Sequence, residues 1–236
     1  MEKNNFSDSI DPAARKISDD IFSNISEDLS LDGLLDRESA ILLNTEFLVS
    51  RRKIPDLSAF IGRDAIIIGP VKADKSNLKI QDSDIVIVSG SAVEYYDIER
   101  QPDFVVTDLD GDLTKLTRFS GSGSICLVQA HGDNIEQIIH AFEICPGPVI
   151  PTCQIESVGY TTNFGGFTDG DRSAFFAHFL GSMKITIFGF DLNSPIVKAG
   201  IDFKTKKKKL DWARKMLSEL YKIRLKRYGK DNLRYL

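Results

Sequence analysis

The sequence predicts an α/β fold in which a mostly parallel, doubly wound sheet is covered by helices on both faces. Two observations lead to this fold class. Short apolar runs rich in β-branched residues recur from residue 64 onward, separated by polar breaks, and such runs are typical of strands that are buried on both faces. Helical stretches lie between several of these runs, and this alternation indicates parallel strands joined by crossover helices.

The first 60 residues show helical spacing. In "DRESAILLNTEFLVSRRK", the apolar residues Ala40, Leu43, Phe47 and Leu48 recur at helical intervals. No glycine-rich linker separates this part from the rest of the chain. We therefore expect residues 1–60 to form a helical cap packed on the main domain.

Residues 61–203 are expected to form the α/β domain. Its helical candidates include "DNIEQIIHAFEI", with Ile135, Ile138, Ile139 and Phe142 on one side, and "RSAFFAHFLG". The strand candidates are "AIIIG" (65–69), "DIVIVSG" (84–90), "FVVTD" (104–108), "SICLVQA" (124–130), "PVIPT" (148–152) and "KITIFGFD" (184–191).

Residues 204–236 are expected to form a basic helix packed on that domain. Leu210, Ala213, Leu217 and Leu220 share one helical stripe, and the other faces are basic. The net charge is −4 overall, but this last segment carries +10 and the first 203 residues carry −14. An acidic body with a basic tail suggests a polyanionic ligand, held by a cation on one side and by lysines on the other.

Composition argues against several classes of protein. No apolar run approaches the roughly 18 residues that a spanning helix needs, and the polar, acidic start lacks the blocks of a signal peptide. We expect a cytoplasmic protein that binds neither membrane nor nucleic acid, because its body is acidic and no aromatic platform interleaves with the basic run. The odd number of cysteines argues against a disulfide framework. The sequence leaves open whether the chain forms a homodimer.

Polar residues gather where the predicted strands end. Asp108–Asp112 follow "FVVT", His131–Asn134 follow "ICLVQA", and Asp191 follows "ITIFGF". The segment "TNFGGFTDGDRS" (162–173) directly precedes a predicted helix. Ligands of open α/β sheets bind beyond the carboxyl ends of the strands, so we expect these segments to meet around one site.

Paired carboxylates at a strand end predict a metal site. Neighbouring carboxylates resist ionising together unless a cation joins them. Mg²⁺ takes one or two carboxylates together with substrate phosphates, so Asp108 and Asp110 are the candidate ligands. A solvated turn is the plainer alternative, because Asp and Gly are common turn formers.

His131 has several interpretations from the sequence. It suits a metal ligand, a general base or, best, a contact that neutralises phosphate charge, and a structural hydrogen bond stays open. Asp133 and Asn134 lie beside it, and either is placed to cap the helix that begins at Ile135.

The lysine run "KTKKKKL" also has two interpretations. Lys204, Lys206 and Lys209 are candidates to reach a triphosphate as flexible point charges. A solvated helical face is the alternative.

The motifs "PDFVVTDLDGD", "HGDN", "TTNFGGFTDGDRSAFFA", "FGFDL" and "K--KL-WA" occur in this order. In this respect the chain resembles the archaeal 6-hydroxymethyl-7,8-dihydropterin diphosphokinase family over roughly residues 60–220. That family is similar in fold to the thiamine diphosphokinases. The resemblance implies a reaction in which ATP gives its β,γ-diphosphate to the CH₂OH group of a pterin, leaving AMP, with Mg²⁺ required.

The resemblance also assigns residues by position. It places Asp108 and Asp110 at a metal–phosphate site, with His131, Asp133 and Asn134 beside it, and it makes Gly165–Arg172 line the shared pocket. In this segment the amides of Gly165 and Gly166 would approach phosphate or pterin, with Thr168 beside them. Asp169 and Asp171 would face metal or pterin nitrogens, and Arg172 would face phosphate. Asn163, Asp169 and Asp171 are the candidates to read the pterin edge, and Phe164 and Phe167 are candidate stacking surfaces.

One departure from the family concerns the first strand. Relatives usually carry a Gly-Pro-Ser turn there, whereas this chain has only Gly69-Pro70 before "VKADKSN". A nucleotide cradle at that turn is therefore in doubt.

Three alternatives to a pterin diphosphokinase stay open. "VVTDLDGDLT" is similar to the signature of haloacid-dehalogenase-type phosphatases, in which Asp108 would be the nucleophile, although two strand candidates precede it and Asp112 replaces the usual threonine. A thiamine diphosphokinase would perform the same reaction type on another alcohol. The third alternative is a non-catalytic nucleotide-binding protein.

Overall fold

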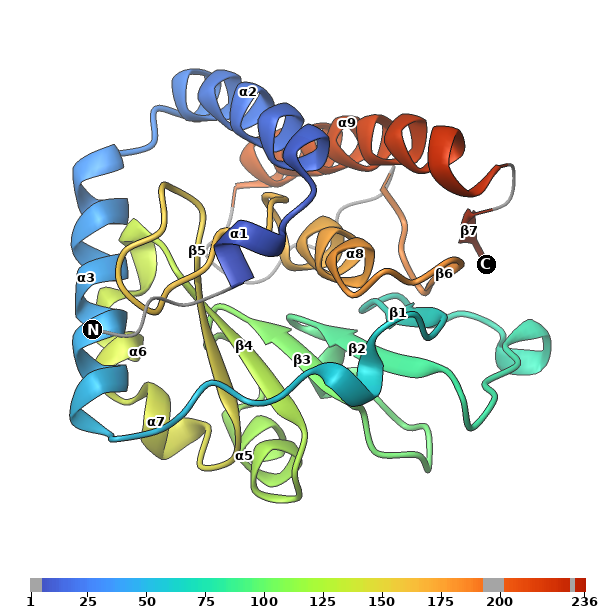
Figure 1. The fold of residues 1–236 in the computed structure, drawn as a ribbon, viewed down its shortest axis with the longest axis horizontal. Coiled ribbons are helices and arrows are strands. Elements are labelled where there is room, and N and C mark those ends of the chain that lie inside the picture. Colours follow the sequence, from blue (N-terminus) through green and yellow to red (C-terminus); the bar gives the residue numbers. More distant parts are fainter. Residues whose placement is uncertain (1–5, 193–201, 230–231) are drawn as a thin grey trace.

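The structure is a computed structural model, and it describes residues 6–192, 202–229 and 232–236 (Figure 1). Within this part of the chain, all strands run parallel in one sheet with the spatial order β5-β4-β3-β2-β1-β6-β7. The predicted doubly wound α/β fold is thereby confirmed. The strands are β1 (Ala65–Ile68), β2 (Ile85–Ser89), β3 (Phe104–Thr107), β4 (Ile125–Ala130), β5 (Val149–Cys153), β6 (Ile185–Phe188) and β7 (Leu233–Tyr235).

Side chains that alternate along the strands supply two hydrophobic cores, one on each face. Ile67 and Ile87 lie in the first core, and Ile66 and Val86 lie in the second. Burial on both faces is why the strands are apolar almost throughout. The helices that contribute to the first core are α1 (Phe6–Ser9), α2 (Pro12–Leu29), α8 (Asp169–Phe179) and α9 (Phe203–Tyr228). Those that contribute to the second are α3 (Gly33–Val49), α4 (Ala92–Tyr95), α5 (Leu113–Gly121), α6 (Ile135–Ile139) and α7 (Ala141–Ile144).

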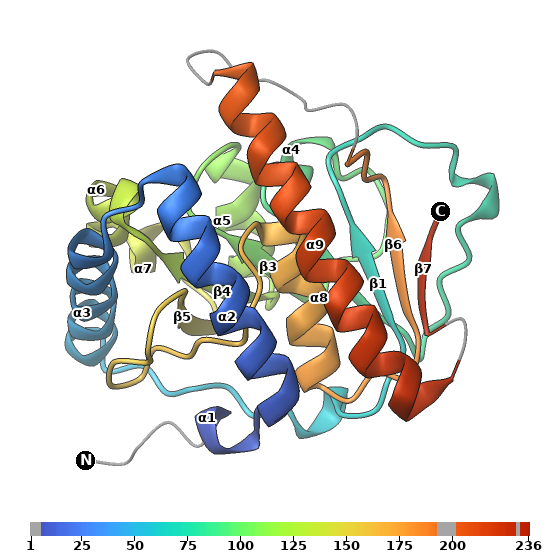
Figure 2. The same cartoon turned by 90° about the horizontal axis from the view of Figure 1, so that it is seen from above.

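The N-terminal segment is helical, as expected, but its two long helices separate. Asp11 caps α2 and Asp32 caps α3, each accepting a backbone N–H through its side chain. Helix α2 lies beside α9 (Figures 1 and 2), and Asp28 there accepts hydrogen bonds from Lys208 (2.8 Å) and Trp212 (2.9 Å). Helix α3 packs instead near β5 and α6. The turn between the two helices therefore reaches the carboxyl edge of the sheet.

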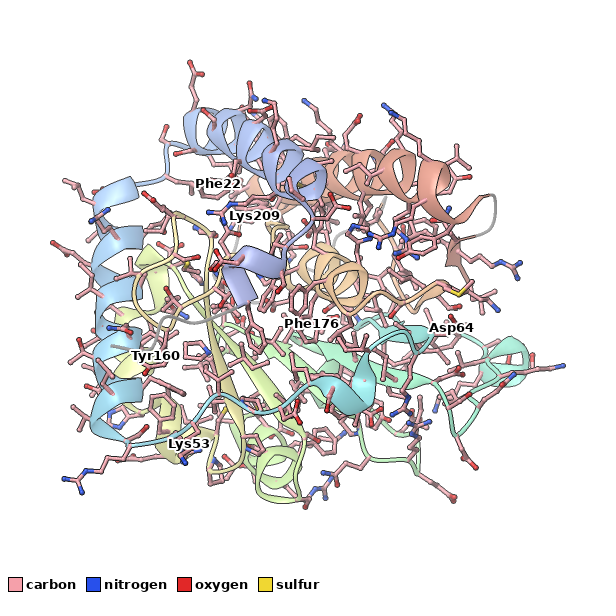
Figure 3. All side chains as sticks on the ribbon, in the orientation of Figure 1. Phe22, Lys53, Asp64, Tyr160, Phe176 and Lys209 are labelled. Atoms are coloured by element: carbon pink, nitrogen blue, oxygen red, sulfur yellow. The ribbon has the colours of Figure 1, made fainter. Side chains whose placement is uncertain are left out.

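The C-terminal helix α9 buries the expected stripe, including Ala213, Leu217 and Leu220. Its basic residues are not all solvated, since Arg224 is fully buried and donates to backbone oxygens of Ser182 and Asn232. In the same layer Phe176 lies between α8 and the sheet (Figure 3). No helix in the described ranges is long and apolar enough to cross a membrane.

Two details of the sequence prediction were wrong. The helix expected over "DNIEQIIHAFEI" is broken at His140 into α6 and α7, and Ile139 is consequently 53% exposed. The strand β7 was missed because it is short and only Leu233 in it is buried, which leaves no apolar run to detect.

Candidate active site at the carboxyl ends of the strands

A cleft of about 1250 Å³ lies where the strands end. Turns that follow β1 to β6 form its floor, and the α2–α3 turn, the start of α8 and the start of α9 form its walls. The segments predicted to meet do therefore meet. The residues of these segments that line the cleft include Asp32, Leu35, Asp36, Pro70–Val71, Ser89–Ser91, Asp108, Asp110–Asp112, His131–Asp133, Gln154, Phe167–Arg172 and Phe190–Leu192.

A tight turn after β3 brings two carboxylates to the cleft. Leu109 adopts φ 65°, a conformation that costs a non-glycine residue about 1–2 kcal/mol. Its amide donates to Thr107 Oγ1 at 2.9 Å, and its side chain is buried. The turn leaves Asp108 and Asp110 on either side of Leu109, and both line the cleft.

Asp108 has one engaged and one unengaged carboxylate oxygen. Its Oδ2 lies 3.6 Å from His131 Nε2. Its Oδ1 is buried and has no hydrogen-bond partner among the described residues. Burial acts to raise the pKa of Asp108, but the neighbouring side chain of His131, together with Asp110, lowers it to about 2. The group is therefore a carboxylate at neutral pH, with an oxygen directed at no donor of the described chain.

The His131–Asn134 turn holds Asp108 in place. The Asp133 amide donates to His131 Nδ1 at 3.3 Å, so Nε2 carries the proton and faces Asp108. Asn134 is buried and donates from Nδ2 to the backbone oxygens of Asp108 (2.9 Å) and Gln129 (2.7 Å). Asn134 occupies the expected N-cap position of α6 but makes no side-chain cap bond to that helix, because its Oδ1 accepts from the His131 amide at 3.0 Å. Asp133 is exposed and lines the cleft.

Gly165 and Gly166 do not present amides to the cleft, contrary to expectation. The Gly165 amide donates to Asn163 Oδ1 (2.9 Å) and the Gly166 amide to Ser18 Oγ (3.0 Å). Both have positive φ, and a side chain on either would overlap α8 residues. The two glycines let this backbone pass close to α8. Within this segment, the residues that line the cleft begin at Phe167. Phe164 is 2% exposed and packs in the core, so it offers no stacking surface.

Asp171 stabilises the start of α8. Its Oδ2 accepts from the Phe167 amide (2.6 Å), and its Oδ1 accepts from the Thr168 amide (2.8 Å) and the Thr168 hydroxyl. This arrangement is a capping box. Burial raises the pKa of Asp171, and the hydrogen bonds oppose that shift. Asp171 and Thr168 border the cleft, but their polar atoms mainly bind one another.

Asp169 and Arg172 lie close to Asp108 and interact with it electrostatically. Burial, followed by the charges of Asp108 and Asp110, raises the pKa of Asp169 well above its usual value, against the effect of Arg172 and Lys206. Arg172 is 2% exposed and donates from Nη2 to the Phe167 carbonyl (2.9 Å). Its Nε and Nη1 are buried and have no hydrogen-bond partner in the described ranges. An anion that entered here would find unused donors.

The lysine run divides at the cleft. Lys206 and Lys209 line it, whereas Lys204 is exposed and outside the lining, and Lys208 pairs with Asp28. Asp191 also lines the cleft, at the end of β6. Cations of α9 and carboxylates of the sheet edge therefore border one space.

The residues fit Mg²⁺, although the described part of the chain holds no preformed site with several ligands. Among the described residues, no three His, Cys, Asp or Glu side chains converge as a metal-binding group. Mg²⁺ commonly binds through one or two carboxylates and completes its shell with water and phosphate oxygens. The unengaged Oδ1 of Asp108, with Asp110 two residues away, is compatible with that donor set.

Sequence reasoning missed several residues that line the cleft. Ser89, Gly90 and Ser91 follow β2, and a side chain on Gly90 would overlap the carboxylate of Asp169. The strand-end rule applied to "IVIVSGS" would have found them. Asp36, on α3, had no signal in the sequence, because its partner Gln154 is 118 positions away.

The fold and the cleft define the class of this protein: a doubly wound α/β protein with a charged cleft at the strand ends, where this architecture binds ligands. A family model described as 6-hydroxymethylpterin diphosphokinase, MptE-like, matches residues 39–196. The chain belongs to this MptE-like family, as its motifs indicated.

Archaeal relatives agree with this membership. A Methanocaldococcus jannaschii protein named 6-hydroxymethyl-7,8-dihydropterin pyrophosphokinase is 34% identical over 224 residues, covering 84% of this chain and 92% of the relative. Proteins of the same name from Pyrococcus furiosus and Methanothermobacter thermautotrophicus are 32% and 30% identical, covering 78% and 75% of this chain and 84% and 78% of the relatives.

Proposed function

We propose that this protein transfers the β,γ-diphosphate of ATP to the hydroxymethyl group of 6-hydroxymethyl-7,8-dihydropterin, giving AMP, with Mg²⁺ held at Asp108 and Asp110. Family membership and the names of the archaeal relatives support the diphosphokinase reaction and the pterin acceptor. The residues of the cleft support ATP as the donor and Mg²⁺ as the metal.

One feature of the cleft most strongly supports a metal-bound phosphate donor. Asp108 Oδ1 and two nitrogens of Arg172 are buried at the cleft without hydrogen-bond partners in the described chain. Buried polar groups are normally paired, because an unpaired one costs about 1–3 kcal/mol. A cation at the carboxylate and phosphate oxygens at the guanidinium would pair both.

The chain's own residues would then bind and orient the reactants. Arg172, Lys206 and Lys209 would bind phosphate oxygens and offset the charge that develops on them. His131 would donate from Nε2 to Asp108, fixing its carboxylate, rather than act as a base, because Nδ1 already accepts the Asp133 amide. Bound Mg²⁺ would supply phosphate bridging and charge neutralisation. In the transfer, the pterin hydroxyl oxygen bonds to the β-phosphorus and its proton passes to water, while the bond from the β-phosphorus to the oxygen that it shares with the α-phosphorus breaks and that oxygen leaves with AMP.

The deciding experiment measures AMP release from ATP with a panel of alcohols. We expect turnover with 6-hydroxymethyl-7,8-dihydropterin and a kcat/KM for thiamine that is lower by roughly 10⁴-fold, as is usual when a site hydrogen-bonds a substrate edge that a competitor lacks. A preference for thiamine would overturn the acceptor while keeping the diphosphokinase reaction. ATP binding without AMP release from any alcohol would contradict the proposed function, and an acyl-phosphate trapped on Asp108 would indicate a phosphatase.

A further inference from the structure

A buried polar pair closes one end of the cleft. Asp36, from α3, is 4% exposed, and Gln154, directly after β5, is 8% exposed, yet both line the cleft. Gln154 Nε2 donates to Asp36 Oδ2 at 2.9 Å, and the Gly132 amide donates to Asp36 Oδ1 at 2.8 Å. The pair joins elements that are far apart in the sequence.

This pair retains hydrogen-bonding capacity. A carboxylate offers about four lone-pair positions, and the bonds above occupy one on each oxygen of Asp36. The hydrogen bond that the structure gives the Gln154 side chain, within the described ranges, runs from Nε2. A carboxylate with spare acceptors at the edge of a cleft suits a ligand that presents two N–H groups side by side.

The walls beside this pair are apolar. Leu31 and Leu35 line the cleft next to Asp36, and Phe167 lines it from the segment before α8. Phe22, whose ring centroid lies 6.3 Å from that of Phe167, borders with Gln154 a smaller hollow of about 390 Å³. Flat apolar surfaces beside a polar edge suit a planar heterocycle.

We propose that this end of the cleft binds the ring of the pterin, with Asp36 and Gln154 hydrogen-bonding its 2-amino and N3–H groups between Leu35 and Phe167. This inference rests on the proposed function and adds where and how its acceptor is recognised. It moves edge recognition away from Asn163 and Asp171, whose oxygens bind the Gly165 amide and the Phe167–Thr168 segment.

The His131–Asn134 turn connects the two halves of the site. From one side its Gly132 amide binds Asp36, and from the other its Asn134 side chain binds the backbone of Asp108. The amino edge and the hydroxymethyl group lie at opposite ends of a 6-substituted pterin. A ring held at Asp36 therefore directs its hydroxyl toward Asp108 and the phosphates.

The test compares two ligands that differ at the recognised edge. We would measure Kd by calorimetry for 6-hydroxymethylpterin and for 6-hydroxymethyllumazine, in which an oxo group replaces the 2-amino group, without ATP or Mg²⁺. The wild-type protein should prefer the pterin by at least about 100-fold, since a lost ligand N–H leaves a buried acceptor unpaired. In Asp36→Asn this preference should fall below about 10-fold, because the amide turns a donor toward the ligand.

Glu94→Gln is the matched control, because Glu94 also lines the cleft and its substitution removes one negative charge, as Asp36→Asn does. It should keep the wild-type preference. If Asp36→Asn does not fold, Gln154→Met tests the same edge and should also narrow the preference.

The outcomes separate this inference from the proposed function. A folded Asp36→Asn or Gln154→Met variant that keeps the full preference for the pterin would overturn the inference, as would a wild-type protein that binds both ligands equally while still releasing AMP with the pterin. A wild-type protein that prefers the pterin, loses this preference in Asp36→Asn, but releases no AMP would contradict the diphosphokinase reaction. The recognition site at Asp36 would still be supported.

Discussion

The turn after β3 and the start of α8 each carry aspartates beside glycines, yet they use them differently. In the first, Asp108 leaves a buried oxygen without a hydrogen-bond partner among the described residues. In the second, Asp171 accepts three hydrogen bonds from Phe167 and Thr168. The longer and more distinctive motif, "GGFTDGDR", therefore pairs most of its polar groups internally, with Arg172 as the exception, whereas the plainer "DLDGD" leaves a carboxylate oxygen of Asp108 unpaired at the cleft.

This difference shows that a distinctive motif need not be a motif of ligand contacts. Gly165, Gly166 and Asp171 build a tight entry to α8, and that entry places Asp169 and Arg172 beside Asp108. Substitutions should therefore separate the two regions, with loss of activity in one and loss of stability in the other.

The largest effect is expected for Asp108→Asn and Asp110→Asn. Each should lower kcat/KM by about 10²-fold or more, because each removes a charge that would hold the metal and phosphates. For Asp110→Asn the free energy of unfolding should stay the same or rise, since repulsion between neighbouring carboxylates is relieved. For Asp108→Asn it should fall at neutral pH, because the lowered pKa of Asp108 means that the fold stabilises its carboxylate. Steady-state AMP release and urea unfolding measure the two quantities. Near-normal turnover at low Mg²⁺ would remove these residues from the metal site.

Asp171→Asn should mainly lower the stability of the protein, with a smaller effect on activity. An amide retains one acceptor oxygen and turns a donor toward the amides of Phe167 and Thr168, so buried donors lose their partner. We expect the free energy of unfolding to fall by about 2–3 kcal/mol, as measured by urea titration, with Asp110→Asn as the comparison. A stable Asp171→Asn variant that had lost activity would place Asp171 among the ligand contacts.

Sequence patterns predicted the fold and the meeting of distant segments because both depend on strand ends, which apolar runs reveal. They could not predict which polar atoms remain unpaired. The amides of Gly165 and Gly166 are paired by Asn163 and by Ser18 of α2, and only the folded chain brings Ser18 there. Asp36 lies on a helix that carries no strand-end signal. Its place in the cleft depends on how α3 packs against the His131–Asn134 turn.

Asp169 should make the stability of the apo protein depend on pH. Burial and the charges of Asp108 and Asp110 raise its folded-state pKa above the unfolded value. As pH rises from the unfolded pKa of about 3.9, the unfolded chain releases its proton first, so stability falls until the folded-state group has also ionised. Asp169→Asn should lack this contribution and be more stable than the wild type at pH 7. Urea titrations at several pH values measure it, and parallel profiles for the two proteins would contradict the raised pKa.

The smallest effect concerns the lysines that border the cleft. Lys206 and Lys209 line it, and Lys204 and Lys207 are exposed outside its lining, so two double alanine variants remove equal charge from the same helix. If the β3 turn faces a metal-bound triphosphate, removing the first pair should raise the KM for ATP at least several-fold, and added salt should reduce the difference. Removing the second pair should leave the KM unchanged, and both variants should keep their free energy of unfolding within about 0.5 kcal/mol of the wild type. An equal rise in KM for both pairs would mean that the helix attracts ATP only through its overall charge. The carboxylates after β3 would then face no specific lysine partner across the cleft.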